Sequence, residues 1–273
     1  VRSRGLGDVY KRQMCVIDVE WGRAVDPGQI ADALKAHPDA KAVFTTLNET
    51  STTVLTDIRA IAEVTRDSDA ILVVDAVSAL GADELRMDEW GVDLVVAGSQ
   101  KALMLPPGLA FAAIGPRVQE AMKHSNLPKY YLSFSKALQG LEKQTTPFTP
   151  VVPLVIALDT ALNLILEEGI EALWARHAKL AQAVRAGILG MGMALFAQRP
   201  SNAATAVKLP DGFDGTALHK RLRDEYKVTC AGGQDHLKGK IERMAHMGYY
   251  DEFDMLVVLG ALERALEDLG ADV

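Results

Sequence analysis

The sequence predicts an α/β fold in which a mostly parallel sheet is sandwiched by helices and is followed by a small C-terminal α+β domain. Two observations lead to this fold class. Between residues 42 and 114, continuous apolar runs alternate with helical stretches, which is typical of parallel strands covered on both faces. After residue 169, short strand-like runs stand between amphipathic helices. We therefore expect a large domain over 14–168 and a small domain over 169–273.

The large domain divides into alternating strands and helices. Strands are expected at 42–46, 70–74, 92–97 and 109–114. A helix is expected over 54–66, because apolar residues recur there at the spacing of one helix face. The proline-rich run 148–153 leads into a helix over 154–168, which ends at Gly169. Residues 115–150 are less regular.

The small domain begins and ends with a helix. The first is expected over 171–189, and the last over 255–269, where an amphipathic pattern stops at Gly270. Between them we expect strands at 204–208, near 228–231 and near 241–245, and a helix over 215–225.

Residues 1–13 differ from the rest of the chain. They are basic, lack apolar periodicity and contain no apolar core of the kind that a secretory signal needs. We expect a non-native leader here. On this interpretation Met14 need not be the true start, and the large domain lacks its N-terminal part.

Composition excludes several classes of protein. Hydrophobic residues make up 49% of the 273 positions and charged residues 24%, which are ordinary values for a globular chain. A net charge of −7 gives no electrostatic footprint for nucleic acid, and no apolar run approaches the roughly 20 residues of a membrane span. The two cysteines, Cys15 and Cys230, allow one disulfide at most, so we expect a cytoplasmic protein.

Polar residues gather where the predicted strands end. The run NETST at 48–52 follows the first strand, Asp75 the second, and Gln100 and Lys101 the third. Ligands of an open parallel sheet bind beyond the carboxyl ends of its strands, so these side chains are expected at one rim. Taken singly, each could be a helix cap or a surface residue. The combination suits pyridoxal phosphate, because a lysine amine forms a Schiff base with it and a carboxylate keeps its pyridine nitrogen protonated.

Four motifs resemble the class V aminotransferases of fold type I, in particular the alanine/serine–glyoxylate (serine–pyruvate) aminotransferase branch. They are LNETST at 47–52, VDAVS at 74–78, GSQKAL at 98–103 with PPG at 106–108, and GKIERM at 239–244. The resemblance implies transfer of an amino group from a small amino acid, alanine or serine, to a small 2-oxo acid, glyoxylate or pyruvate. It also implies pyridoxal phosphate as cofactor and a homodimer with shared active sites.

The resemblance assigns cofactor-binding roles to the matching residues. Lys101 would be the Schiff-base lysine and the catalytic proton carrier, and Asp75 would bind the pyridine nitrogen. Val77 would pack on the ring, Thr50 would bind near the ring oxygen, and Gln100 would reach the phosphate.

Two further roles follow from the resemblance. Thr149 would reach the phosphate held by the partner subunit, and Arg243 would bind the substrate α-carboxylate, which its planar guanidinium matches. The chain also departs from the family, with Leu47 where a His is usual and Thr53 where a Gly is frequent. The family's Ser-Gly-Thr-Gly phosphate loop and its stacking aromatic are not found, as expected of a chain lacking roughly a quarter of a typical member.

Other functions are less consistent with the sequence. A cysteine desulfurase-like lyase of the same fold would place His immediately before the lysine, where this chain has Gln100, and Cys230 is expected in the core. A nicotinamide-dependent dehydrogenase would need a Gly-rich turn after the first strand, but this chain has NETST there. No metal site is expected, because the spacing of His236 and His246 fits no ligand signature. A non-catalytic subunit or inactive fragment of the family stays open as an alternative, although it would not need Lys101 and Asp75 together.

Overall fold

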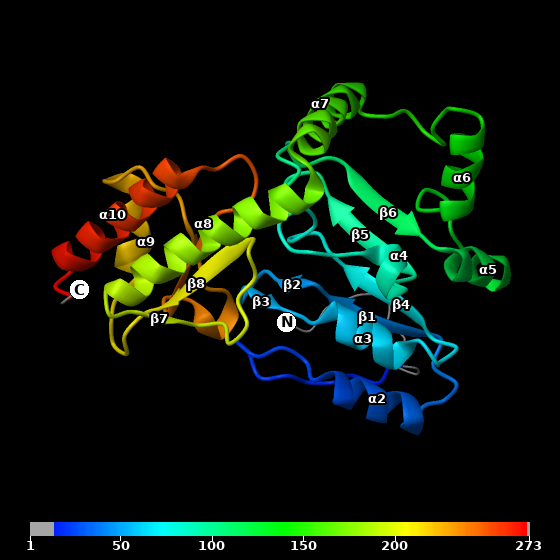
Figure 1. Ribbon diagram of the computed structural model, residues 1–273, viewed down its shortest axis with the longest axis horizontal. Coiled ribbons are helices and arrows are strands. Elements are labelled where there is room, and N and C mark those ends of the chain that lie inside the picture. The colour runs from blue at the N-terminus through cyan, green and yellow to red at the C-terminus, as the bar shows by residue number, and fades with distance from the viewer. Residues whose placement is uncertain (1–13, 272–273) are drawn as a thin grey trace.

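A four-stranded sheet organises the first part of the chain in the computed structural model, which describes residues 14–271 (Figure 1). The strands lie in the order β1 (Ala42–Thr46), β4 (Ile71–Asp75), β5 (Leu94–Gly98) and β6 (Ala110–Ile114). β1, β4 and β5 are parallel, and β6 is antiparallel to β5. The connection that contains the PPG turn is too short for a parallel crossover, so β6 runs back along β5. The predicted mostly parallel sheet is confirmed, whereas the predicted leader lies outside the described residues.

Helices α2 (Pro27–Ala36) and α3 (Ile58–Thr65) cover one face of this sheet. A buried core joins them to the strands through Ile58 and Ile61 of α3 and Leu72 and Val74 of β4. Burying such side chains contributes about 1.5–3 kcal/mol each. The short α4 (Met87–Trp90) packs next to α3.

The predicted helix over 54–66 begins too early. Residues 54 and 55 form β3 (Val54–Leu55), which pairs with β2 (Asn48–Glu49), and the helix begins only at Ile58, after the N-cap of Asp57. The amide of Leu55 donates to the carbonyl of Arg199 at 2.8 Å. This partner is far away in the sequence, so the local apolar pattern could not indicate the strand.

Residues 115–150, which had no clear pattern, form α5 (Pro116–His124) and α6 (Phe134–Glu142). The next helix, α7 (Val152–Glu168), ends at the predicted position, because Gly169 has a φ of 85° that favours glycine. The predicted domain boundary falls between α7 and α8 (Ile170–Gly190) and stays a prediction. No helix within residues 14–271 is long and apolar enough to cross a membrane.

A second sheet, on the left in Figure 1, is antiparallel throughout. Its order is β7 (Ala194–Leu195), β8 (Ala204–Lys208), β10 (Ile241–Ala245) and β9 (Ala231–Gly232). The predicted strands at 204–208 and 241–245 are confirmed, but the strand near 228–231 is reduced to β9. Residues 228 and 230 instead contribute side chains to the edge of the core.

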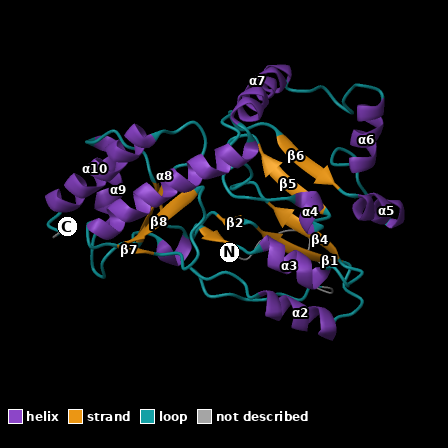
Figure 2. Ribbon diagram, in the orientation of Figure 1, coloured by secondary structure: helices purple, strands orange, loops and turns teal. Residues whose placement is uncertain are grey.

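Three helices cover this second sheet, as Figure 2 shows in purple beside the orange strands. They are α8, α9 (Gly215–Asp224) and α10 (Glu252–Asp268). Val207 of β8 and Met244 of β10 point into the core beneath them. Because side chains alternate along a strand, Arg243 points away from these helices, towards the first sheet.

Candidate active site

The candidate site lies at the carboxyl ends of the three parallel strands. Pairing places Thr46 of β1 opposite Asp75 of β4, and Asp75 opposite Val96 of β5. The loops that carry Thr50 and Lys101 leave the sheet from this same edge. The structure therefore collects the predicted residues of all three loops at one rim.

Asp75 and Val77 follow β4 in a turn that the aspartate itself closes. The Asp75 carboxylate is exposed and accepts the amide of Val77 at 2.9 Å. Val77 is half-buried and lies beside Gly98. A Cβ atom built on Gly98 would come 3.5 Å from Cγ1 of Val77. An accessible carboxylate thus stands beside an apolar side chain.

Thr50 connects three parts of the rim. Its hydroxyl is hydrogen-bonded to the hydroxyl of Ser78, in the loop after β4. Its carbonyl accepts a hydrogen bond from Nη1 of Arg243 on β10. Ser78 received no role from the sequence, although it belongs to the same VDAVS motif.

The loop after β5 carries Gln100 and Lys101 and is held by buried Ser99. The Ser99 hydroxyl donates to the carbonyl of Pro106 at 2.8 Å and accepts the amide of Leu109 at 3.2 Å. Gly98 precedes this loop and leaves room for the Gln100 side chain, whose Oε1 would lie 2.9 Å from a Cβ atom at position 98. Lys101 is partly exposed, so its amine remains accessible at the rim.

Arg243 extends from the second sheet to the rim. Its Nε and Nη2 donate to the carbonyl of Gly232 at 3.1 and 2.8 Å, and 9% of the residue is exposed. Burial lowers the pKa of Arg243, and the carboxylates of Glu242 and Glu49 oppose this shift. Arginine keeps its charge under such conditions, so this part of the rim is cationic.

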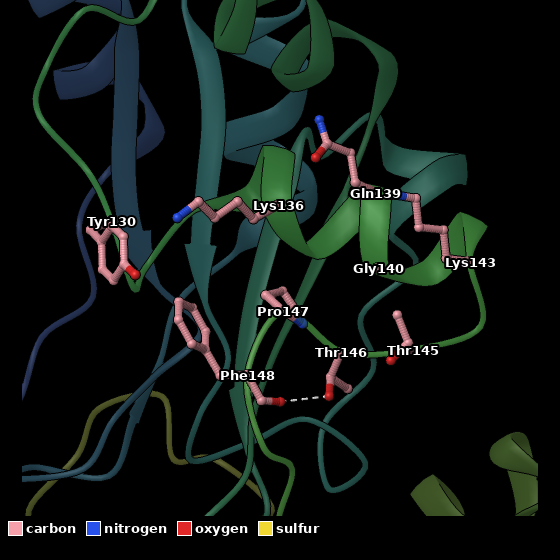
Figure 3. Close-up of a pocket in the computed structure, with 9 residues that line it drawn as sticks. All are labelled: Tyr130, Lys136, Gln139, Gly140, Lys143, Thr145, Thr146, Pro147 and Phe148. Carbon is pink, nitrogen blue, oxygen red and sulfur yellow. Dashed lines mark hydrogen bonds between the residues drawn. The ribbon is translucent and has the colours of Figure 1, made fainter.

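Thr149 is not brought to this rim by any hydrogen bond of the described residues. It is exposed in the loop before α7, next to a cavity of about 300 Å³ (Figure 3).

This cavity is lined in part by Lys136 and Tyr130. Lys136 lies over the ring of Tyr130, with its Nζ 3.9 Å from the ring centre. The hydroxyl of Thr146 donates to the carbonyl of Phe148 at 2.6 Å, the dashed line in Figure 3.

The donor set at the rim fits pyridoxal phosphate. It combines a primary amine (Lys101), a carboxylate (Asp75), a hydroxyl (Thr50) and an amide (Gln100) within three adjacent loops. The aldehyde of the cofactor forms a Schiff base with an amine, and a carboxylate keeps the pyridine nitrogen protonated. Among the residues from 14 to 271, no group of three or more His, Cys, Asp and Glu side chains could hold a metal ion.

Comparison with known proteins identifies the family. Residues 10–246 match the family described as aminotransferase class-V. The chain belongs to the class V aminotransferases. The predicted family resemblance and the fold class of its members are thereby confirmed, and the family implies pyridoxal phosphate as cofactor.

Several relatives support the assignment. The chain is 42% identical to the soluble hydrogenase small subunit of Synechococcus, covering 96% of this chain and 70% of that protein. It is 36% identical to the serine–glyoxylate aminotransferase of Hyphomicrobium methylovorum, covering 94% and 66%. It superposes on the crystal structure of pyridoxamine–pyruvate aminotransferase from Mesorhizobium loti with a TM-score of 0.89 and 36% identity, covering 93% and 67%. The first relative carries a hydrogenase name, whereas the family and the other two relatives are named for amino-group transfer.

The departures from the family pattern have structural explanations. Leu47 is buried in the core beneath β1 and β4. Thr53 adopts a φ of 60°, a conformation that glycine enters more easily, while its hydroxyl accepts the amide of Ala206 at 3.2 Å. Cys230 packs at the edge of the second core, and burial raises its pKa to about 12. Such a thiol carries little thiolate at neutral pH, which argues against a desulfurase nucleophile.

His246, three residues after Arg243, is fully buried. Its Nδ1 donates to the carbonyl of Asn202 at 2.8 Å, and its Nε2 accepts the hydroxyl of Thr205 at 2.9 Å. Burial, together with the nearby charge of Arg185, lowers the pKa of His246 from 6.5 to about 3. His246 is therefore a neutral structural residue at physiological pH.

Replacement of His246 by glutamine is expected to reduce the acid sensitivity of the fold. Below pH 6.5 His246 binds a proton in the unfolded state but not in the native state, so the native state loses stability as the pH falls. Between pH 7.5 and 5.5 this loss is about 1.4 kcal/mol in the free energy of unfolding. Urea titrations at both pH values should show a pH dependence that is smaller by this amount in H246Q than in the wild type and in the exposed control H124Q. Equal pH dependence in all three proteins would contradict the assignment.

Proposed function

We propose that this protein is a pyridoxal-phosphate-dependent aminotransferase acting on small substrates. The donor would be alanine or serine, and the acceptor would be glyoxylate or pyruvate. The observation that carries the proposal is the rim itself, where Lys101 and Asp75 share one sheet edge and Arg243 reaches it through Thr50. The named activities of the two relatives that transfer amino groups, with glyoxylate and with pyruvate, support this substrate class.

The cofactor would be held by residues of all three loops. Lys101 would attach it covalently, Asp75 would bind its pyridine nitrogen, and Gln100 would donate to its phosphate. Val77, half-buried beside Gly98, would pack on the ring, and Thr50 would donate near the ring oxygen. When bound, pyridoxal phosphate supplies an electron sink for the carbanionic α-carbon.

Two residues would act on the substrate. Arg243 would bind the α-carboxylate, because its fork presents parallel N–H donors that match both oxygen atoms. Lys101 would also take a proton from the α-carbon as a general base. Because every candidate substrate has an α-carboxylate, Arg243 orients the substrate without choosing between side chains.

The protein would act as a homodimer with shared sites. The helix α7 has no buried residue, and its large apolar side chains Val155, Ile156, Leu164 and Leu166 are exposed. A second copy of the chain would cover part of this helix and would place Thr149, in the loop before α7, against the partner's phosphate.

Borohydride trapping tests the cofactor site. The purified chain is incubated with pyridoxal phosphate, reduced, and digested for mass spectrometry. Modification is expected at Lys101, and K101A should lose it, whereas K136A should keep it because Lys136 belongs to the separate cavity before α7. Labelling of another lysine in K101A to the wild-type extent would remove the basis of the proposal.

Steady-state kinetics tests the role of Arg243. R243A is expected to raise KM for both the amino acid and the oxo acid by about 10–100-fold, since a hydrogen bond to a charged group contributes about 1.5–3 kcal/mol. R243K should lie between R243A and the wild type. The exposed R223A of α9 serves as the control. A KM unchanged in R243A would assign the carboxylate to another residue.

Sedimentation equilibrium tests the dimer. I156D should shift the protein towards monomer, because a carboxylate on the covered face of α7 would be buried without a partner. L256D, at a similarly exposed leucine of α10, should leave the dimer intact. Dissociation by L256D alone would move the interface to α10.

A further inference from the structure

We propose that Asp83, which lies outside the candidate site, is a positioning residue that holds Arg243 in place relative to the Lys101 loop. This inference rests on the proposed function, in which Arg243 binds the substrate carboxylate. Asp83 has no role in the sequence motifs discussed above. Its carboxylate is nevertheless buried at the contact between the two sheets.

The surroundings of Asp83 are formed by the second part of the chain. The residue is 3% exposed and ends the turn after β4, where its amide donates to the carbonyl of Ala79 at 2.9 Å. Its carboxylate accepts the hydroxyl of Ser201 and, at 2.9 Å, the amide of Asn202. A buried carboxylate is costly unless it is hydrogen-bonded, so these bonds tie the segment before β8 firmly to the first sheet.

The same segment holds the end of β10. The carbonyl of Ala203 accepts the amide of His246 at 3.1 Å, and the carbonyl of Asn202 accepts Nδ1 of His246 at 2.8 Å. Arg243 lies opposite Ala206 in the β8–β10 ladder. Through this ladder, a displacement of residues 201–203 moves the backbone that carries Arg243.

Arg185 of α8 also holds this segment. Its Nη2 donates to the carbonyls of Pro200, at 3.3 Å, and Ser201, and it reaches Oδ1 of Asn202 at 3.4 Å. Asp83 and Arg185 therefore place opposite charges around one short segment. His246 is the nearest other titratable side chain bonded to this segment, and Arg199 adds a second positive charge nearby.

The turn that ends at Asp83 also contacts the Lys101 loop. Ala82, Ala102 and Ala203 form one small buried cluster, and Ala102 directly follows Lys101. A Cβ atom at Gly81 would lie 3.4 Å from the Cβ of Ala102. The turn is thus in contact with the catalytic loop on one side and with the Arg243 sheet on the other, so it sets the distance between them.

The test compares D83A with D83N in the full chain. D83A loses all acceptors for Ser201 and Asn202, so KM for the amino acid and for the oxo acid should rise about tenfold, the loss of one buried hydrogen-bond partner. Its kcat and its affinity for pyridoxal phosphate should stay within about twofold. D83N can still accept the Asn202 amide and donate to Ser201 Oγ, and it should restore KM to within about threefold. The exposed D88N of α4 is the matched control.

A readout that does not depend on turnover separates positioning from simple loss of stability. The dissociation constant of propionate, a non-reactive carboxylate, should rise about tenfold in D83A, in parallel with KM. S201A gives a milder version of the same defect if D83A does not fold. A lower thermal midpoint with unchanged KM and unchanged propionate binding in D83A or S201A would overturn the proposal. If R243A changes KM but D83A and S201A do not, the proposed function stands and the role of Asp83 is wrong. If R243A also leaves KM unchanged, the proposed role of Arg243 is wrong, and the role of Asp83 is wrong with it.

Discussion

Parallel pairing of β1, β4 and β5 is the constraint on which the candidate site depends. The pairing places Thr46, Asp75 and Val96 at one level, so the loops that follow these strands begin at one edge. The hydroxyl, amide, carboxylate and amine groups of the three loops are brought together there, although the loops are far apart in the sequence. The antiparallel β6 begins beside this edge, where Ala110 pairs with Gly98, and the hydroxyl of Ser99 holds the Lys101 loop against the turn before β6. The consequence is a single rim that collects the side chains proposed to hold pyridoxal phosphate.

The second sheet completes the rim by contributing one cation. The alternation of side chains sends Met244 into the core beneath α8, α9 and α10 and leaves Arg243 facing the first sheet. Arg243 then bonds the carbonyl of Thr50, whose hydroxyl bonds Ser78. Two buried polar contacts, at Thr53 and at Asp83, hold the two sheets together near this bond. The site and the joint between the sheets are therefore parts of the same hydrogen-bonded structure.

The sequence predicted best where burial and local pattern agree. The strands β1, β8 and β10 were placed without error, and the end of α7 was marked by Gly169. The helix over 54–66 was predicted too long, because residues 54 and 55 pair with β2 and the amide of Leu55 donates to the carbonyl of Arg199, contacts that apolar spacing does not indicate. The helices α5 and α6 were missed; each is only nine residues long and buries a single residue, Val118 or Gly140. The contacts of Ser78 and Asp83 had no local signal, because their partners lie far along the chain.

By itself, the sequence determined the fold class, the family and the chemistry of the rim, because strand-forming runs and the residues after them are adjacent along the chain. The approach of Arg243 to Thr50 was decided only by the tertiary structure, which joins residues of two different sheets. The same holds for the burial of His246 and for the capture of residues 201–203 by Asp83 and Arg185. Local pattern records which side chains a strand presents, whereas the partner of a buried charge depends on how the two sheets pack against each other.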